Sequence, residues 1–196
     1  MNAKPVKKTN IVYRLLVIFV PIAVIAVGIL IGYNFFRDGG TGAAVCFVGP
    51  IVLSVAWWIL GPTTIWNQKK KKMMKDLGEQ GFNRNQTFYG SNQTVAVDIR
   101  QGKVALLFFW NPFEQYILPA SRIAKAWTAD GAGGAGFLRG TSRVSFLFLI
   151  DEVKVRVNTF TSNQRWKMDD PKILEAISKA DMMVQALDAA KQSAGE

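Results

Sequence analysis

The sequence contains no histidine and a single cysteine, Cys46, among its 196 residues. Without histidine, one chain cannot build a histidine-ligated zinc site, nor the Ser-His and Cys-His pairs that activate a nucleophile. A single cysteine excludes a disulfide within the chain. These absences remove the commonest designs of hydrolytic and zinc-dependent active sites. We therefore predict a protein that is not an enzyme, with no catalytic residue, no bound metal and no cofactor.

Paired acidic side chains are also scarce, and the two adjacent pairs have structural explanations. Asp151 and Glu152 fall between two predicted strands, where a turn is expected, and neighbours on a strand would point to opposite faces. Asp170, which follows Asp169 and precedes Pro171, is typical of a residue that caps the start of a helix. Neither pair predicts a general acid and base.

The glycine-rich segment at residues 130–140, DGAGGAGFLRG, is similar to a phosphate-binding loop in composition alone. It lacks the Gly-Lys-Ser/Thr ending, and no predicted helix follows it. We interpret it as a loop between two strands. Arg139 and Arg143, within and just after it, are interpreted first as a solvated basic edge; the alternative is that they bind an anion or the carboxylates of a protein partner.

Two long apolar segments occupy the first third of the chain. Residues 11–36 are apolar apart from Arg14 and Asn34, and residues 43–66 contain no charged residue. A helix needs about 20 such residues to cross a bilayer, so the pattern predicts a transmembrane hairpin with a short polar turn. A cleaved signal peptide is the alternative for the first segment, but that apolar run is longer than usual and lacks a clear cleavage site.

Basic residues cluster at one end of this predicted hairpin. The N-terminal tail (residues 1–10) and Arg14 hold four Lys and Arg, and residues 69–75 hold five, whereas the connecting turn has Arg37 beside Asp38. Lys and Arg near the ends of spans favour the cytoplasmic side. Both termini are therefore predicted to be cytoplasmic.

The run of lysines has two compatible interpretations and a weaker third. It is a topology signal, and it is also a candidate contact for anionic lipid, worth about 1 kcal/mol per lysine near the surface. Nucleic acid is disfavoured as a partner because the run has no interleaved aromatic residues and no recognition motif. The candidate lipid-contacting residues are Lys69, Lys70, Lys71, Lys72 and Lys75.

Gly28 and Gly32 form a G-x-x-x-G pattern in the first apolar segment. Such spacing lets two helix backbones approach closely. We favour packing of the first predicted span on the second. A homo-oligomer that uses this face is the alternative.

After a predicted basic linker at residues 67–83, the chain alternates β-rich segments with turns. The apolar turn FFWNPF at residues 108–113 is interpreted first as core, with a partner surface or a membrane-dipping tip as alternatives. From Pro171 the period becomes helical, with one apolar stripe facing a core. The stripe consists of Ile173, Ile177, Ala180, Val184 and Leu187. The strands are expected near residues 94–99, 103–110, 114–118, 122–130, 143–150 and 152–160.

This order of elements resembles the pleckstrin-homology-like (PH-like) fold, and in particular the PH-like domains of bacterial membrane-anchored proteins. The similarity covers residues 84–191 and includes VAVDIRQGKVALLFF (residues 95–109) and YILPASRIAKAWTADG (residues 116–131). It implies an α+β membrane protein in which a bent antiparallel sheet or barrel is capped by a C-terminal amphipathic helix. It also implies the bacterial inner membrane as the location.

The resemblance does not extend to inositide binding, because Arg100 and Lys103 are the only basic residues flanking the first hairpin turn. We predict a non-enzymatic adaptor or scaffold whose PH-like domain binds an unidentified protein and anionic membrane lipid. The alternative is a structural subunit of a bacterial envelope assembly, such as a secretion or conjugation system, in which the spans make the contacts.

Overall fold

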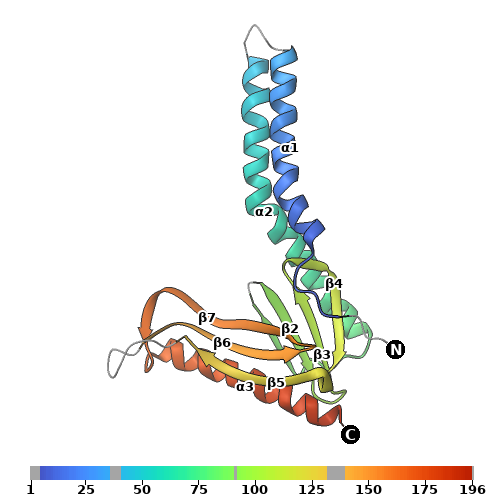
Figure 1. Cartoon of the computed structure of the whole chain (residues 1–196), viewed down its shortest axis with the longest axis vertical. Coiled ribbons are helices and arrows are strands. Elements are labelled where there is room, and N and C mark those ends of the chain that lie inside the picture. The colour runs from blue at the N-terminus through green and yellow to red at the C-terminus, as the bar shows by residue number, and fades with distance from the viewer. Residues whose placement is uncertain (1–4, 36–40, 91, 132–139, 196) are drawn as a thin grey trace.

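The computed structural model describes residues 5–35, 41–90, 92–131 and 140–195. A pair of long helices projects from a β-rich module, and the C-terminal helix lies on the side of the module away from that pair (Figure 1). The chain is thus an α+β protein with two apolar N-terminal helices, as the sequence predicts.

The two N-terminal helices run antiparallel, and each is long and apolar enough to cross a membrane. Helix α1 spans Ile11–Phe35 and helix α2 spans Thr41–Glu79. Two polar side chains of α2 hydrogen-bond to the backbone of α1. The Ser54 hydroxyl donates to the carbonyl of Pro21 at 2.9 Å, and the Trp58 indole donates to that of Val17 at 3.2 Å.

Gly28 and Gly32 lie where α1 packs closely on α2. A Cβ atom added to Gly28 would lie 2.2 Å from Cγ of Pro50, and one added to Gly32 would lie 3.0 Å from the ring of Phe47. Both glycines therefore face the other helix of the same chain. The helix contact leaves no room for a larger side chain at Gly28.

The predicted linker at residues 67–83 is instead helical as far as Glu79. The reason is an apolar stripe that continues the helix beyond its first, fully apolar half. Trp66, Met73 and Leu77 recur at helical spacing, and all three are buried. The first part of α2 thus packs on α1, and its last part packs on the module.

The strands of the module form two antiparallel sheets rather than one (Figure 1). The four strands of sheet A and the three of sheet B pair in sequence order, and the described strands do not close into a barrel. The short 3₁₀ helix Ala120–Arg122 joins the two sheets. Sheet A contains β1 (Gln86–Tyr89), β2 (Gln93–Asp98), β3 (Lys103–Phe108) and β4 (Asn111–Pro119); sheet B contains β5 (Ile123–Asp130), β6 (Gly140–Ile150) and β7 (Val153–Lys167).

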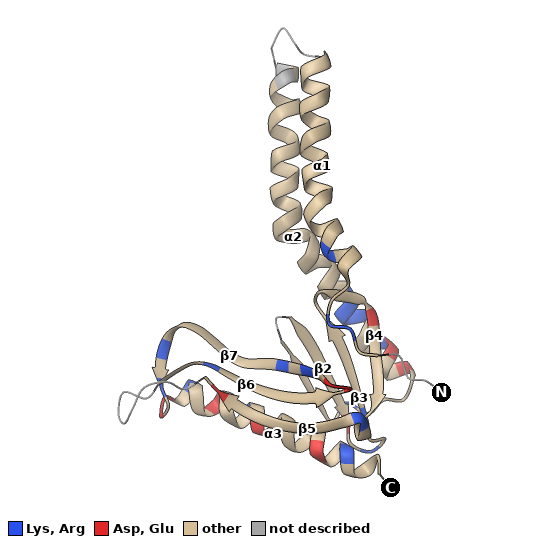
Figure 2. Ribbon diagram, viewed as in Figure 1, with Lys and Arg blue, Asp and Glu red and all other residues tan. Residues whose placement is uncertain are grey.

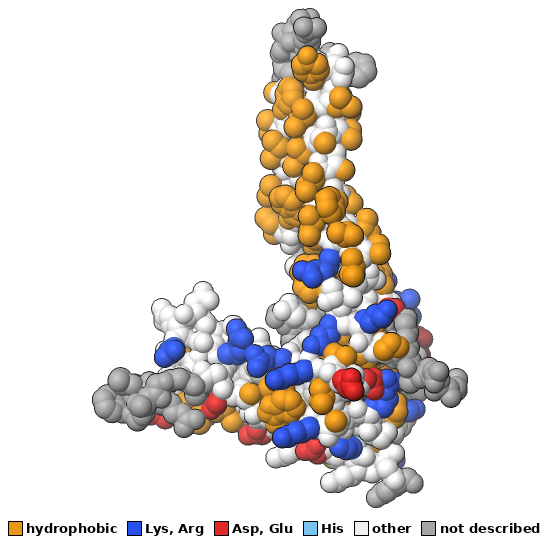
Figure 3. Space-filling model, viewed as in Figure 1, with side chains coloured by type: hydrophobic (Ala, Val, Ile, Leu, Met, Phe, Trp, Pro, Cys, Tyr) orange, Lys and Arg blue, Asp and Glu red, His pale blue; other side chains and the backbone are white. Residues whose placement is uncertain are grey.

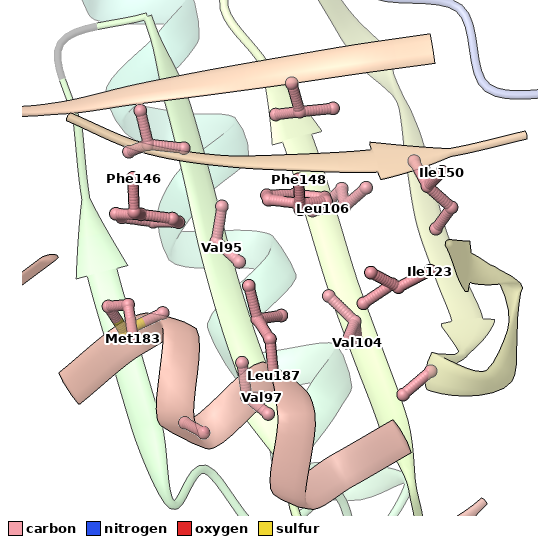
Figure 4. Close-up of a cluster of buried hydrophobic side chains, with 14 of the residues drawn as sticks. Val95, Val97, Val104, Leu106, Ile123, Phe146, Phe148, Ile150, Met183 and Leu187 are labelled. Atoms are coloured by element: carbon pink, nitrogen blue, oxygen red, sulfur yellow. The ribbon is translucent and has the colours of Figure 1, made fainter. Parts of the chain in front are cut away.

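Helix α3 (Pro171–Ser193) covers the inner faces of both sheets and completes the core (Figure 4). Its start is capped by the carboxylate of Asp170, which accepts a hydrogen bond from the backbone N–H of Lys172 at 2.9 Å. Phe146 and Phe148 of β6 stack in the centre of the core. In the predicted stripe of α3, Ile173, Ala180 and Leu187 are fully buried, whereas Ile177 and Val184 are partly buried.

Candidate functional site

The last third of α2 is packed on the outer face of sheet A. Trp66, Met73 and Leu77 form a second apolar cluster with small and branched side chains of the sheet. Ala96 of β2 and Ala105 of β3 are neighbours in register, and their short side chains let the helix approach closely. The helix that leaves the apolar pair is therefore held by a second hydrophobic core, separate from the core beneath α3.

The N-terminal segment before α1 is also docked on the module. Val6 is buried in the main core, although the sequence surrounding it predicts a basic tail. The ammonium group of Lys8 donates to the carbonyl of Lys154 in β7, and burial lowers the pKa of Lys8. The start of α1 is consequently tied to the same module as the end of α2.

A polar network around Tyr116 completes this docking. The backbone N–H of Lys7 donates to the Tyr116 hydroxyl at 3.1 Å, and the side-chain amide of Asn111 donates to the Lys7 carbonyl at 2.9 Å. The Tyr116 hydroxyl donates to the carboxylate of Glu114 at 2.5 Å. Burial, followed by the hydrogen bond to Glu114, raises the pKa of Tyr116 to about 12. The network therefore keeps a neutral phenol beneath the N-terminal segment.

Aromatic and basic side chains surround the base of the helix pair, and we call this set the collar. The backbone N–H of Asn10 donates to the carbonyl of Trp110 at 2.7 Å, which ties the β3–β4 turn to the start of α1. The ring of Tyr13 meets that of Phe113 edge-on, with centroids 5.4 Å apart. The collar consists of Tyr13, Arg14, Trp66, Lys69, Lys70, Tyr89, Phe109, Trp110 and Phe113.

Within the apolar turn at residues 108–113, the buried residues are Phe108, Asn111 and Pro112. Phe108 is buried, Phe109 and Trp110 are half-buried, and Phe113 is exposed. The interpretation of the whole turn as core is therefore wrong. Strand alternation directs Phe108 into the core, while the rings of Phe109, Trp110 and Phe113 contact aromatic side chains of the helix pair.

Three cations of the collar lie over the faces of aromatic rings, where the ring quadrupole attracts positive charge. Lys69 lies over Phe113 (5.0 Å from the charged nitrogen to the ring centroid), and Arg14 lies over Trp110 (5.3 Å from Cζ). Lys70 lies near two rings, those of Trp66 (5.8 Å) and Tyr89 (5.9 Å).

The five candidate lipid-contacting lysines thus occupy different surroundings on one helix. Lys69 and Lys70 are half-buried within the collar, whereas Lys71 and Lys72 are exposed. Lys75 is also exposed, and its ammonium lies 3.6 Å from the carboxylate of Glu79 one turn later. The structure brings the first two lysines against the module and leaves the next two pointing into open space. Basic residues near the base of the helix pair are visible in Figure 2.

The outer face of sheet B carries a second group of basic side chains. Lys125 and Lys154 both place their ammonium groups over the Trp127 ring, at 5.7 and 5.4 Å from its centroid. Trp127, Leu147 and Arg156 lie side by side in register on β5, β6 and β7. Figure 3 shows Lys and Arg side chains gathered on the visible face of the module below the helix pair.

A shallow cavity of about 230 Å³ adjoins this face at the start of β6. Arg143, for which anion binding is the alternative interpretation, lines it, together with Arg156 of β7. Arg139, which was interpreted together with Arg143, lies outside the described residues. The remaining lining residues are Ala129, Asp130, Gly131, Ser142 and Ser145.

Sequence reasoning did not find the docking of the N-terminal segment or the collar. Val6 lies among lysines and belongs to no periodic apolar pattern, so the sequence does not indicate that it is buried. The aromatic composition of residues 108–113 pointed toward the collar, through the alternative of a membrane-dipping tip. Within the described residues, no group of His, Cys, Asp and Glu side chains is arranged to hold a metal ion.

Comparison of the chain with models of known protein families, with curated proteins and with solved structures found no significant match.

Proposed function

We propose that this chain is a membrane-anchored, non-enzymatic adaptor. Helices α1 and α2 cross the membrane, and the module binds a protein partner at the cytoplasmic surface. The observation that carries the proposal is the continuity of α2, whose first part is exposed and apolar and whose end is buried on sheet A. A module joined in this way cannot swing freely, so its binding surface is presented in a fixed orientation to the membrane.

The proposed orientation places the module and both termini in the cytoplasm of a bacterial cell, at the inner membrane. It is supported by the basic residues at the module end of the helix pair, which include Arg14 and Lys69–Lys72. A reporter active only outside the cytoplasm should be silent when fused after Glu196 and active when inserted at Gly40. The reverse pattern would overturn this orientation.

The proposal of a PH-like module rests on the arrangement of its elements. A four-stranded and a three-stranded antiparallel sheet, followed by a C-terminal helix that covers the core, support the likeness. No inositide site is proposed, because this likeness concerns fold alone.

The partner surface that we propose is the outer face of sheet B. Lys125, Lys154 and Arg156 give it positive charge, and Trp127 adds a large apolar contact. Aromatic residues and arginine are enriched where proteins bind each other. By charge complementarity, the partner segment should be acidic.

The second candidate function is a structural subunit of an envelope assembly whose contacts are made by the spans. It is supported by an apolar groove of about 430 Å³ between α1 and α2, lined in part by Val27, Gly28 and Pro50. Side chains of a neighbouring transmembrane helix, including that of a second copy, would fit such a groove.

Site-specific photo-crosslinking in intact cells separates the two functions. A photoreactive phenylalanine analogue is placed at Trp127 in one variant and at Val27 in another, both in the full chain. The adaptor function predicts a crosslinked protein at Trp127, lost when Lys154 and Arg156 are changed to Glu. Crosslinks at Val27 alone, to another membrane protein or to a second copy, would support the assembly function instead.

A further inference from the structure

We infer that the module itself enters the lipid headgroup layer through the side chains of Phe113 and Tyr89. The inference rests on the proposed function in one respect, namely that α1 and α2 cross the membrane. It adds a lipid-contacting surface to the β-sheet module, which the spans and the exposed lysines do not provide.

The position of Phe113 along the direction of the helix pair is set by its contact with α1. Its ring lies edge-on to Tyr13, the third residue of that helix. At the same level, apolar side chains of α1 are already open to the surroundings, since Ile11 is 72% and Val12 66% exposed. Exposed apolar surface of this kind requires lipid when the helix spans a bilayer. Phe113 therefore lies at the level where the lipid-facing surface begins.

Tyr89 reaches the same level from the neighbouring turn of sheet A. The β1–β2 and β3–β4 turns are adjacent, because the backbone N–H of Phe109 donates to the carbonyl of Asn92 at 2.8 Å. Tyr89 and Phe113 are 57% and 56% exposed, unusually high for large aromatic side chains. Both turns lie at the end of sheet A nearest to the helix pair (Figure 1).

The chemistry of these two positions fits the membrane interface better than water or hydrocarbon. Each exposed ring has a lysine ammonium above it, Lys69 at Phe113 and Lys70 at Tyr89. Aromatic rings are enriched at the headgroup level, and lysines there are attracted to anionic lipid. The ring can contact the upper acyl chains while the ammonium remains among phosphates. Continuity with the apolar surface of α1 favours lipid over a protein partner as the occupant.

Fluorescence quenching in the full chain tests this inference. Cys46 is replaced by Ala, and a single cysteine is then introduced in separate variants at Phe113, Tyr89, Ile29 and Met182. Each is labelled with an environment-sensitive nitrobenzoxadiazole dye and reconstituted in vesicles of phosphatidylcholine and phosphatidylglycerol. Ile29 is an exposed position within α1, and Met182 is an exposed position on α3. Helix α3 lies on the side of the module away from the helix pair (Figure 1).

Lipids with a spin label near the headgroup should quench the dye at positions 113 and 89 at least twofold more than at position 182. A spin label deep in the acyl chain should quench the dye at position 29. If position 29 is quenched but positions 113 and 89 behave like position 182, the inference is overturned, while the proposal that α1 and α2 cross the membrane is retained. If position 29 is not quenched by either lipid, α1 does not cross the membrane. Both that proposal and the inference are then overturned.

Discussion

The two halves of α2 belong to one helix but present different surfaces. Along residues 44–65, apolar side chains point in all directions and most are exposed, whereas along residues 66–79 a single stripe is apolar and that stripe is buried. A helix that is apolar all round requires apolar surroundings, and an amphipathic helix requires one partner surface. The change in pattern near Trp66 therefore marks where the surroundings of the helix change.

The first prediction compares an aspartate introduced into each half of α2, and the largest effect is expected in the buried half. Leu77→Asp would place an unpaired charge in the cluster between α2 and sheet A, where Leu77 is 0% exposed. We expect a loss of about 3 kcal/mol or more in the free energy of unfolding of the module. Urea unfolding of the purified full chain in mild detergent measures it.

Ile59→Asp is the matched control in the exposed half of α2. It should leave the stability of the module unchanged. Since α2 is proposed to cross the membrane, it should also reduce the membrane-integrated fraction, because Asp in a span is costly, by up to about 2.5–3.5 kcal/mol at the centre. Equal destabilisation of the module by both changes would contradict the division of α2 into two halves.

An effect of similar or smaller size is expected within α3, which contacts the module alone. Leu187→Ala removes a fully buried side chain and should cost about 2–5 kcal/mol. Ile177→Ala removes a partly buried one and should cost roughly 1 kcal/mol. Neither should alter membrane integration. Similar costs for the two variants in urea unfolding would show that Ile177 is as essential to the core as Leu187.

The Tyr116 network beneath the N-terminal segment predicts that the stability of the folded chain falls at alkaline pH. The pKa of Tyr116 is raised from 10.0 to about 12 in the folded chain, so below pH 10 the phenol is neutral whether the chain is folded or unfolded. Between pH 10 and 12 the unfolded chain loses this proton first, and stability falls. Two pKa units correspond to about 2–3 kcal/mol.

Tyr116→Phe should remove that part of the decline. The measurement is the difference in unfolding free energy between the native chain and the variant, compared at pH 9 and pH 12. Lysines also titrate in this range, but they are common to both proteins. If the two stability profiles stay parallel from pH 9 to pH 12, Tyr116 does not hold its proton in the way described.

The smallest expected effect distinguishes lysines on the same helix. Lys69→Gln with Lys70→Gln removes three cation–π contacts, one made by Lys69 and two by Lys70, each worth about 0.5–1 kcal/mol where solvent screens the pair. Lys71→Gln with Lys72→Gln removes exposed charges and should stay within about 0.5 kcal/mol of the native chain. Thermal unfolding of the two double variants gives the comparison. A larger shift for the second pair would show that the collar does not use its lysines for stability.

Much of the fold follows from local patterns in the sequence. The two apolar helices, most strands and α3 were predicted because each has a clear period or composition, and Asp170 before Pro171 marked the start of α3. The turn between β6 and β7 was also predicted, where Asp151 and Glu152 adopt positive φ angles of 47° and 66°. The short strand β1 was not predicted, since QTFY lies among polar residues without an alternating pattern.

The candidate site was less predictable because it is made by contacts between distant segments. The helical stripe of Trp66, Met73 and Leu77 is readable in the sequence, but the lysines between them suggested a polar linker. The contact of Asn10 with Trp110 joins residues one hundred positions apart, and no local pattern encodes such a pairing. Division of the strands into two sheets likewise depends on packing around α3 rather than on strand composition.

The unbroken path of α2 also restricts how the chain can change in length. Each residue of an α-helix turns it by about 100° and lengthens it by about 1.5 Å. Deleting one residue between Ile59 and Trp66 would rotate the buried stripe away from sheet A. Inserting seven, close to two full turns, would restore the rotation but move the module by about 10 Å. Helix α1 would then be too short, since Val6 and Asn10 hold its start to the same module. The two helices can therefore change length only together.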